Sequence, residues 1–251
     1  MNDILIAFIV FACVLSAAVV GTRLHVKLPT HHRDGDSREV IKLVMGLIAT
    51  IAALVLGLLI ASAHSSYDTQ ESEVRQLAVH LELTDRVLAH YGPETASARE
   101  LLHQIVSDDI DRIWASDGKA NLGPMTARVH AEQLFTKVAE LVPINNVQRF
   151  TQNRTMQLLT EMSNTRRLMS EQARGSLSWP FFVVLVFWLV VLFVGFGLFA
   201  RLNATVFAAL FIGALSVSGA IFLILEMNNA YSGLMQISSA PMRSALQQIG
   251  K

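Results

Sequence analysis

Four long apolar stretches dominate the pattern of hydrophobic and polar positions along the chain. A helix needs about 20 apolar residues to cross a hydrocarbon core about 30 Å thick. The stretches run from about Ile4 to Val20, Val44 to Ala63, Phe181 to Ala200 and Thr205 to Leu225. Each is nearly free of charge, so we predict four membrane-spanning helices. The first follows an acidic Met-Asn-Asp start, unlike the basic front of a secretory signal, and we expect it to be retained.

Between the second and third stretches the chain changes character. Charged residues appear at nearly every turn, and apolar residues such as Val74, Leu77 and Leu81 recur at helical spacing. The pattern therefore predicts an all-α, four-span helical membrane protein with a soluble helical bundle between spans two and three. The predicted parts are a first transmembrane hairpin (1–63), a soluble helical domain (64–178), a second transmembrane hairpin (179–227) and a C-terminal interfacial segment (228–251).

Turn-forming residues divide the middle domain into four helices. The first ends at Tyr91-Gly92-Pro93, and Ser97 with Glu100 has the spacing of a capping box that begins the second. Glycines and prolines near residues 117–124, followed by Pro143, bound the third helix. We expect the fourth to run from about 145 to 178.

The junction after the second span contains no breaker. Nothing between Ala63 and Tyr91 interrupts the helical pattern, so we predict that this span continues out of the membrane as one long helix. At the other end of the domain, Trp179-Pro180 is suited to the first turn of the third span.

The spans differ in the size of their side chains. The third is bulky on all sides, which is typical of a lipid-facing helix. The second carries a stripe of small residues at three- and four-residue spacing: Gly46, Thr50, Ala53, Gly57 and Ala61. Small residues allow helix backbones to approach closely in membranes. The stripe therefore indicates contact with another helix or, alternatively, the lining of a pore.

The last residues of the chain predict a short helix that begins at Ser239-Ala240-Pro241. Met242, Ala245 and Ile249 give it one apolar face. We expect this face to lie at the bilayer interface or against a neighbouring subunit.

Composition narrows the function further. The chain is 52% hydrophobic and 16% charged, with 20 basic and 20 acidic residues, and no basic patch indicates a nucleic-acid partner. The sequence has no phosphate-binding glycine loop and no nucleophile elbow, and its lone cysteine lies inside an apolar run. We predict that the protein is not an enzyme, with no catalytic residue and no cofactor.

Clusters of potential metal ligands lack the required spacing. His31 and His32 are adjacent, and adjacent side chains point in different directions. Asp108, Asp109 and Asp111 resemble half of a calcium loop without its glycine and closing glutamate. We predict no metal site. Glu226, the one acid at the end of an apolar span, is either functional or extends to the lipid headgroups.

Two short strings carry a family resemblance. Ser65-Ser66-Tyr67-Asp68, directly after the second span, resembles the segment that follows the pore-lining span in bacterial bestrophins. The string 225–233 contains Glu226, Asn228, Asn229 and Gly233, and it is similar to a string of the bacterial family called bestrophin-like. The chain is identified as a member of that family, which is remotely similar to bestrophin ion channels.

Bestrophins are homopentameric ion channels with four spans per subunit and a helical soluble domain that extends the pore. The resemblance implies a multi-pass protein of the bacterial inner membrane, a homo-oligomer (a pentamer by resemblance) and an inorganic ion as the permeating species. It also implies an apolar constriction at Leu54, Leu58 and Ala61, because hydrophobic rings gate by dewetting. The pore-lining candidates are Thr50, Leu54, Gly57, Leu58, Ala61, Ser62 and Ser65.

Several features leave a second hypothesis open. The aromatic and arginine residues that follow the Tyr-Asp string in bestrophins are Thr69-Gln70-Glu71 here, and no acidic run suited to calcium gating follows the fourth span. The alternative is a non-conducting membrane sensor or scaffold whose soluble domain binds a ligand or partner.

Two observations predict opposite orientations of the chain in the membrane. Arg23, Lys27, Arg33 and Arg38 in the first loop favour a cytoplasmic loop, which places the large domain outside. The bestrophin resemblance implies that the large domain is cytoplasmic.

Overall fold

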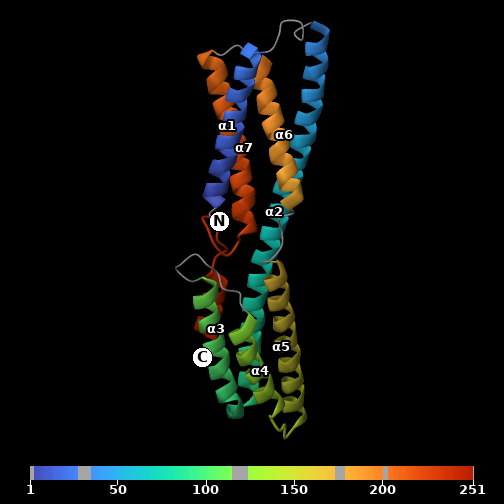
Figure 1. Cartoon of the computed structure of the whole chain (residues 1–251). Coiled ribbons are helices and arrows are strands. Elements are labelled where there is room, and N and C mark those ends of the chain that lie inside the picture. The colour runs from blue at the N-terminus through green and yellow to red at the C-terminus, as the bar shows by residue number, and fades with distance from the viewer. Residues whose placement is uncertain (1–2, 28–34, 115–123, 173–178, 200–202, 251) are drawn as a thin grey trace. The chain divides into compact units, whose positions relative to one another are not determined.

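The computed structural model describes residues 3–27, 35–114, 124–172, 179–199 and 203–250. These residues form α-helices and one 3-10 turn, without a strand (Figure 1). The elements are α1 (Asp3–Lys27), α2 (Gly35–Tyr91), η2 (Pro93–Thr95), α3 (Ala96–Ile113), α4 (Pro124–Ala139), α5 (Asn146–Gln172), α6 (Trp179–Phe199), α7 (Ala204–Asn228) and α8 (Ala240–Gln248). The predicted all-α, four-span class is confirmed, because α1, α2, α6 and α7 are each long and apolar enough to cross a membrane.

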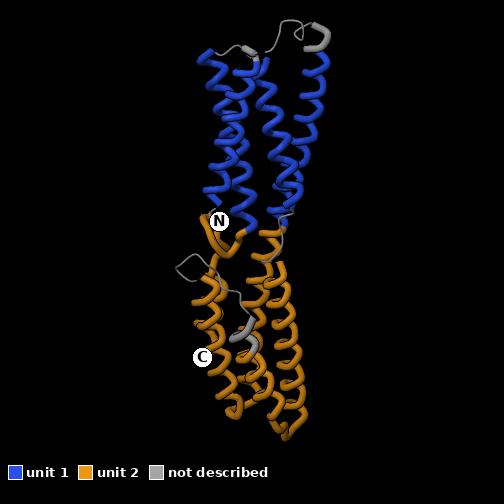
Figure 2. The backbone as a smooth tube through the Cα atoms, viewed as in Figure 1, with its two compact units in different colours: residues 1–65, 177–228 blue, residues 66–176, 229–251 orange. Residues whose placement is uncertain are grey.

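The chain divides into two compact units (Figure 2). Unit 1 comprises residues 1–65 and 177–228, and unit 2 comprises residues 66–176 and 229–251. Helix α2 contributes to both units, since it continues without interruption from Gly35 to Tyr91. This confirms the prediction of one long helix, which ends where Gly92 and Pro93 follow.

In unit 1, α1 packs along α6 and α7, and the backbones of α1 and α6 come into direct contact. A Cβ atom added to Gly197 would lie 2.1 Å from the carbonyl oxygen of Ala18. One added to Gly21 would lie 2.1 Å from the carbonyl oxygen of Val194. The interpretation of the third span as lipid-facing on all sides is therefore wrong, because two glycines allow α6 to approach α1 closely.

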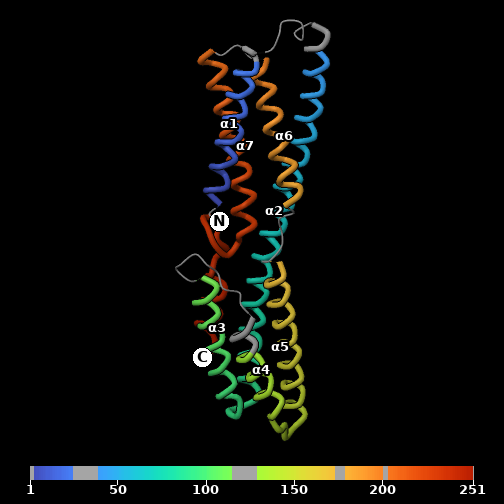
Figure 3. Tube along the Cα trace, in the orientation of Figure 1, coloured from blue at the N-terminus to red at the C-terminus, as the bar shows by residue number. Residues whose placement is uncertain are grey.

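In unit 2, the second part of α2 and helices α3, α4, α5 and α8 surround one apolar core. Figure 3 shows the C-terminal end of the trace beside α3, with which α8 is in contact. Met242 and Ala245 are 1% and 0% exposed, and Ile249 is also buried. The apolar face of α8 therefore belongs to this core. The expectation that 228–251 is an interfacial segment is corrected, because residues 229–251 complete unit 2.

Local differences from the predicted boundaries have local causes. Helix α3 begins at Ala96, so Ser97 lies inside the helix and is not its N-cap. The residue before the helix is Thr95, whose hydroxyl donates to the carbonyl oxygen of Leu88 at 2.6 Å. Asp109 also lies inside α3, which rules out the calcium-loop interpretation. Helix α5 ends at Gln172, and residues 173–178, like His31 and His32, lie outside the described residues.

Candidate functional site: the exposed side of helix α2

The membrane-spanning part of α2 has one side turned toward its own chain. Met45, Ala52 and Ala63 are 9%, 3% and 7% exposed, and their spacing of seven and eleven residues places them on the same side of a helix. Met45 lies against Gly195 of α6, where an added Cβ atom would come within 2.4 Å of the Met45 methyl carbon. This side fixes the span in unit 1.

The predicted pore-lining residues all lie away from that side and are exposed. Leu54 and Leu58 are each 69% exposed. Steps of three and four residues along α2 bring the candidates to one broad side of the helix. They are Thr50, Leu54, Gly57, Leu58, Ala61, Ser62 and Ser65.

The small-residue stripe on this part of α2 does not pack against another helix of the described chain. A Cβ atom added to Gly46 or Gly57 would have nothing within 4 Å. The hydroxyl of Thr50 donates to the carbonyl oxygen of Gly46 at 2.9 Å, so its hydrogen is already satisfied within the helix. The stripe is therefore a surface of the single chain, and the predicted contact with another helix is not made within the described residues.

The chemistry of this side changes along the helix. It runs from Leu54 and Leu58 through Ala61 to Ser62 and Ser65. In a symmetric oligomer each of these residues would be repeated as a ring around the axis. Leucine rings repel water, whereas serine hydroxyls can replace part of the hydration shell of an ion.

The residues that carry the family resemblance occupy different environments. Tyr67 is half-buried and packs against the core of unit 2, where burial, with Glu71 and Asp68 nearby, raises the pKa of its phenol. Asp68 is exposed. Glu226, at the end of α7, is 3% exposed, so it is buried and does not extend freely into a headgroup layer.

The string after α7 makes a tight turn. Asn228 is half-buried, Asn229 is exposed, and the carbonyl oxygen of Asn229 accepts from the Ser232 amide at 2.9 Å. Gly233 has φ +96°, a conformation that favours glycine. Beyond the turn, the Trp114 indole N–H donates to the carbonyl oxygen of Ile237 at 2.7 Å, which attaches the segment to the end of α3.

Unit 2 contains a buried polar group that the sequence analysis missed. Glu73 is 8% exposed, and its Oε1 accepts from the Gln172 side-chain amide at 2.9 Å. Tyr231, from the family string, is 5% exposed and lies close enough that the Glu73 charge raises its pKa, although burial is the larger cause. Within the described part of the chain, Glu73 Oε2 and the Tyr231 hydroxyl have no hydrogen-bond partner.

A weak signal for this group exists in the sequence. Gln70, Glu73 and Leu77 follow one another at helical spacing, and Gln70 and Leu77 are 1% and 2% exposed. A carboxylate in a core-facing stripe is unusual, because burial disfavours its charged form. That same burial raises the pKa of Glu73, and the hydrogen bond from Gln172 lowers it by less.

Glu73→Gln should stabilise unit 2 at neutral pH. Since the pKa of Glu73 is raised in the folded state, its favourable contribution is complete below its ordinary value and is lost as the pH rises through the raised value. The amide cannot ionise, so we expect a gain of about 1 kcal/mol at pH 7 and no gain near pH 4. Thermal unfolding of both proteins at the two pH values checks this.

The control for that measurement is Glu140→Gln, which changes the same groups at an exposed position. It should leave the unfolding temperature unchanged at both pH values. If the Glu73→Gln protein is less stable than the parent at pH 7, burial of the charged Glu73 carboxylate does not destabilise unit 2, which contradicts the prediction.

A family model described as a bestrophin-like domain matches residues 12–242. This chain belongs to the bestrophin-like family. The match begins within α1 and extends into α8, so it includes most of both units. The resemblance carried by the string inside α2 and by the string at the end of α7 therefore extends to almost the whole bestrophin-like chain.

Solved structures share the fold. A bacterial bestrophin homolog from Klebsiella pneumoniae aligns with a TM-score of 0.71 at 10% identity, over 96% of this chain and 96% of that chain. A variant of the Klebsiella protein gives 0.70 at 9% identity over 97% of each chain. A structure described as a membrane protein gives 0.71 at 10% identity over 96% of this chain and 99% of that one. No curated protein matches the sequence.

Proposed function

We propose that this bestrophin-like protein forms a homo-oligomeric ion channel or pore, with α2 lining the path. The observation that carries the proposal is the uncovered surface of α2. In its most apolar stretch only 11% of the residues are buried within the chain, against 28–33% in the other three spans. The span that contributes least to its own subunit's packing is thus the one that carries the pore-lining candidates.

The composition of the exposed side of α2 supports a role other than lipid contact. Gly57, Ser62 and Ser65 are small or polar, and they leave little side-chain surface for contact with lipid tails. The exposed side of α6 carries large residues, among them Phe181, Val183 and Phe187, whereas on α2 the exposed leucines alternate with these small or polar residues. A path wide enough for an ion at the serines and narrow at Leu54 and Leu58 uses both kinds of residue.

The proposal includes the assembly and the location of the protein. Five copies around one axis would place five α2 helices side by side, each with its small residues toward the path or the next copy. The multi-pass subunit would lie in the bacterial inner membrane and would pass an inorganic ion. The family and the apolar helices support this assignment.

Two measurements on the purified protein test the proposal together. Native mass spectrometry counts the subunits, for which we expect five. Reconstitution into liposomes loaded with salt, with release followed for several anions and cations over a range of pH, should show a flux that empty liposomes lack. A monomer or dimer without flux would instead favour the membrane sensor or scaffold.

A further inference from the structure

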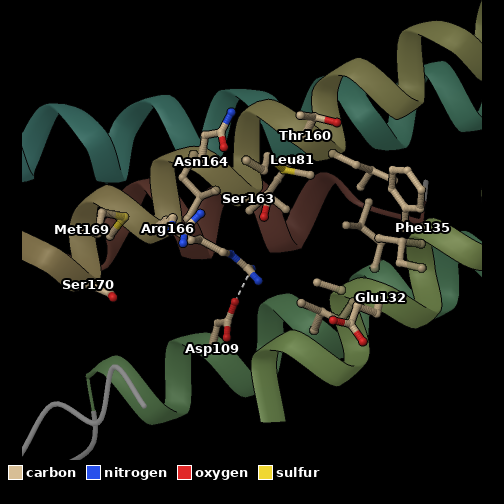
Figure 4. Close-up of a pocket in the computed structure, with 18 of the residues that line it drawn as sticks. Leu81, Asp109, Glu132, Phe135, Thr160, Ser163, Asn164, Arg166, Met169 and Ser170 are labelled. Carbon is tan, nitrogen blue, oxygen red and sulfur yellow. Dashed lines mark hydrogen bonds and ion pairs between the residues drawn. The ribbon is translucent and has the colours of Figure 1, made fainter. Parts of the chain in front are cut away.

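Unit 2 contains a cavity of about 630 Å³ within its helical bundle. Its walls come from α2, α3, α4 and α5 (Figure 4). Pockets that bind small molecules commonly measure about 300–1,000 Å³ and combine apolar walls with a few placed polar groups. This cavity has both features.

The apolar part of the cavity is formed by side chains of the bundle core. Leu77 and Leu81 of α2 are 2% and 0% exposed, and Leu102 and Ile105 of α3 are 1% and 3% exposed. Phe135 of α4 also lines the cavity and is 44% exposed. Such walls suit an aliphatic or aromatic body, and they offer it no hydrogen-bond partner.

The polar part of the cavity is organised around Asp109, which is 4% exposed. Its Oδ1 accepts from Arg112 of the same helix, and its Oδ2 accepts from Arg166 of α5. Figure 4 shows the Arg166 guanidinium directed toward Asp109 across the cavity. With both carboxylate oxygens engaged, Asp109 acts to orient Arg166.

Arg166 retains donors for a ligand. A guanidinium carries five N–H groups in a planar fork that matches a carboxylate. Among the residues that the structure describes, Arg166 donates to Asp109 through one nitrogen, Nη2. Arg167 and the hydroxyl groups of Ser163 and Ser170 line the same cavity, so they add further donors.

We propose that this cavity binds a small monocarboxylate with an apolar body, held by Arg166 at its carboxylate. The cavity also contains the acid Glu132, which disfavours a ligand of higher negative charge such as a nucleotide. The apolar walls disfavour a small hydrated anion. This binding site does not depend on the proposed conduction, and it is tested by a binding measurement alone.

The test uses 1-naphthaleneacetate and its neutral analogue 1-naphthaleneacetamide, titrated calorimetrically into the full-length protein in lipid nanodiscs. Heats from empty nanodiscs are subtracted. We expect saturable binding of the acid, at least about 10-fold tighter than that of the amide, since a hydrogen-bonded charge contributes about 10- to 100-fold. Equal affinity for the two compounds, or heats no larger than those of empty nanodiscs, would overturn the proposal.

Variants separate the two parts of the cavity. Arg166→Gln should weaken acid binding at least about 10-fold and remove the preference over the amide. Ser163→Phe, at an exposed lining position that leaves the ion pair intact, should weaken both compounds by filling space. Arg154→Gln, on the exposed side of the same helix and outside the cavity lining, should change neither affinity.

Circular dichroism and thermal unfolding verify that each variant is folded. If Arg166→Gln unfolds, Arg166→Lys supplies the test, because it keeps the charge and loses the planar fork, and it should reduce the acid's advantage. Unchanged acid binding in Ser163→Phe and in the folded arginine variant would place the site elsewhere and refute the assignment.

Discussion

Replacing Leu58 by serine should raise ion flux through reconstituted protein by about tenfold or more, which corresponds to a barrier lowered by about 1.4 kcal/mol. Leu58 is 69% exposed in the single chain and lies one turn after the equally exposed Leu54. In an assembly the substitution changes every copy of the ring at once. A constriction lined by leucine resists wetting, and hydroxyl groups would hydrate it.

The matched control for the Leu58 variant is Leu215→Ser on α7. Leu215 is 56% exposed and lies on a different span, so its replacement introduces the same chemistry at a position outside the proposed path. We expect flux from this variant to equal that of the parent. If Leu58→Ser leaves flux unchanged, or if both variants raise it equally, α2 does not line the path at this depth.

Leu54→Ser independently tests whether rings of leucine on α2 form the constriction. Leu54 and Leu58 are four residues apart and therefore on the same side of the helix. Each substitution should raise flux by itself, and the double variant should conduct more than either. Ions of different size should respond differently, because widening and wetting the constriction act together.

Gly197→Ala should markedly destabilise the membrane-spanning unit, although alanine is the better helix former by about 1 kcal/mol. The added Cβ atom would lie 2.1 Å from the carbonyl oxygen of Ala18, which is a backbone atom and has no rotamer to change. Helices α1 and α6 would have to separate along their contact. Overpacking of this kind costs about 1–3 kcal/mol or more.

The same substitution at Gly57 is the control, since a Cβ atom there meets nothing within 4 Å. Thermal unfolding followed by size-exclusion chromatography in detergent compares the two proteins. Gly197→Ala should lower the unfolding temperature by several degrees, and Gly57→Ala should leave it unchanged or raise it slightly. Equal stability of the two variants would show that α1 and α6 do not touch as described.

The glycine comparison also bears on the assembly. Gly57 lies on the side of α2 that we assign to the path or the neighbouring copy, so Gly57→Ala can change subunit count or flux without changing the stability of the subunit. Gly197 acts within one subunit. The pair therefore separates the packing of the chain from the packing of the oligomer.

The sequence by itself determined the elements and the family. The length of an uncharged, apolar stretch depends only on consecutive residues, so the sequence alone predicted α1, α2, α6 and α7 as helices able to cross a membrane. Glycine and proline act locally on the backbone, and Gly92-Pro93 ended α2 where expected. The absence of a breaker after Ala63 likewise predicted the continuous helix.

Only the tertiary structure decided which side of each element is covered and by what. Helical spacing shows that α8 has an apolar face, but the core of unit 2 and the bilayer would both suit it. Asp109 and Arg166 are 57 residues apart, and Glu73 and Gln172 are 99 apart. Such pairs depend on how distant helices are brought together, and residue spacing within one helix carries no information about a partner on another.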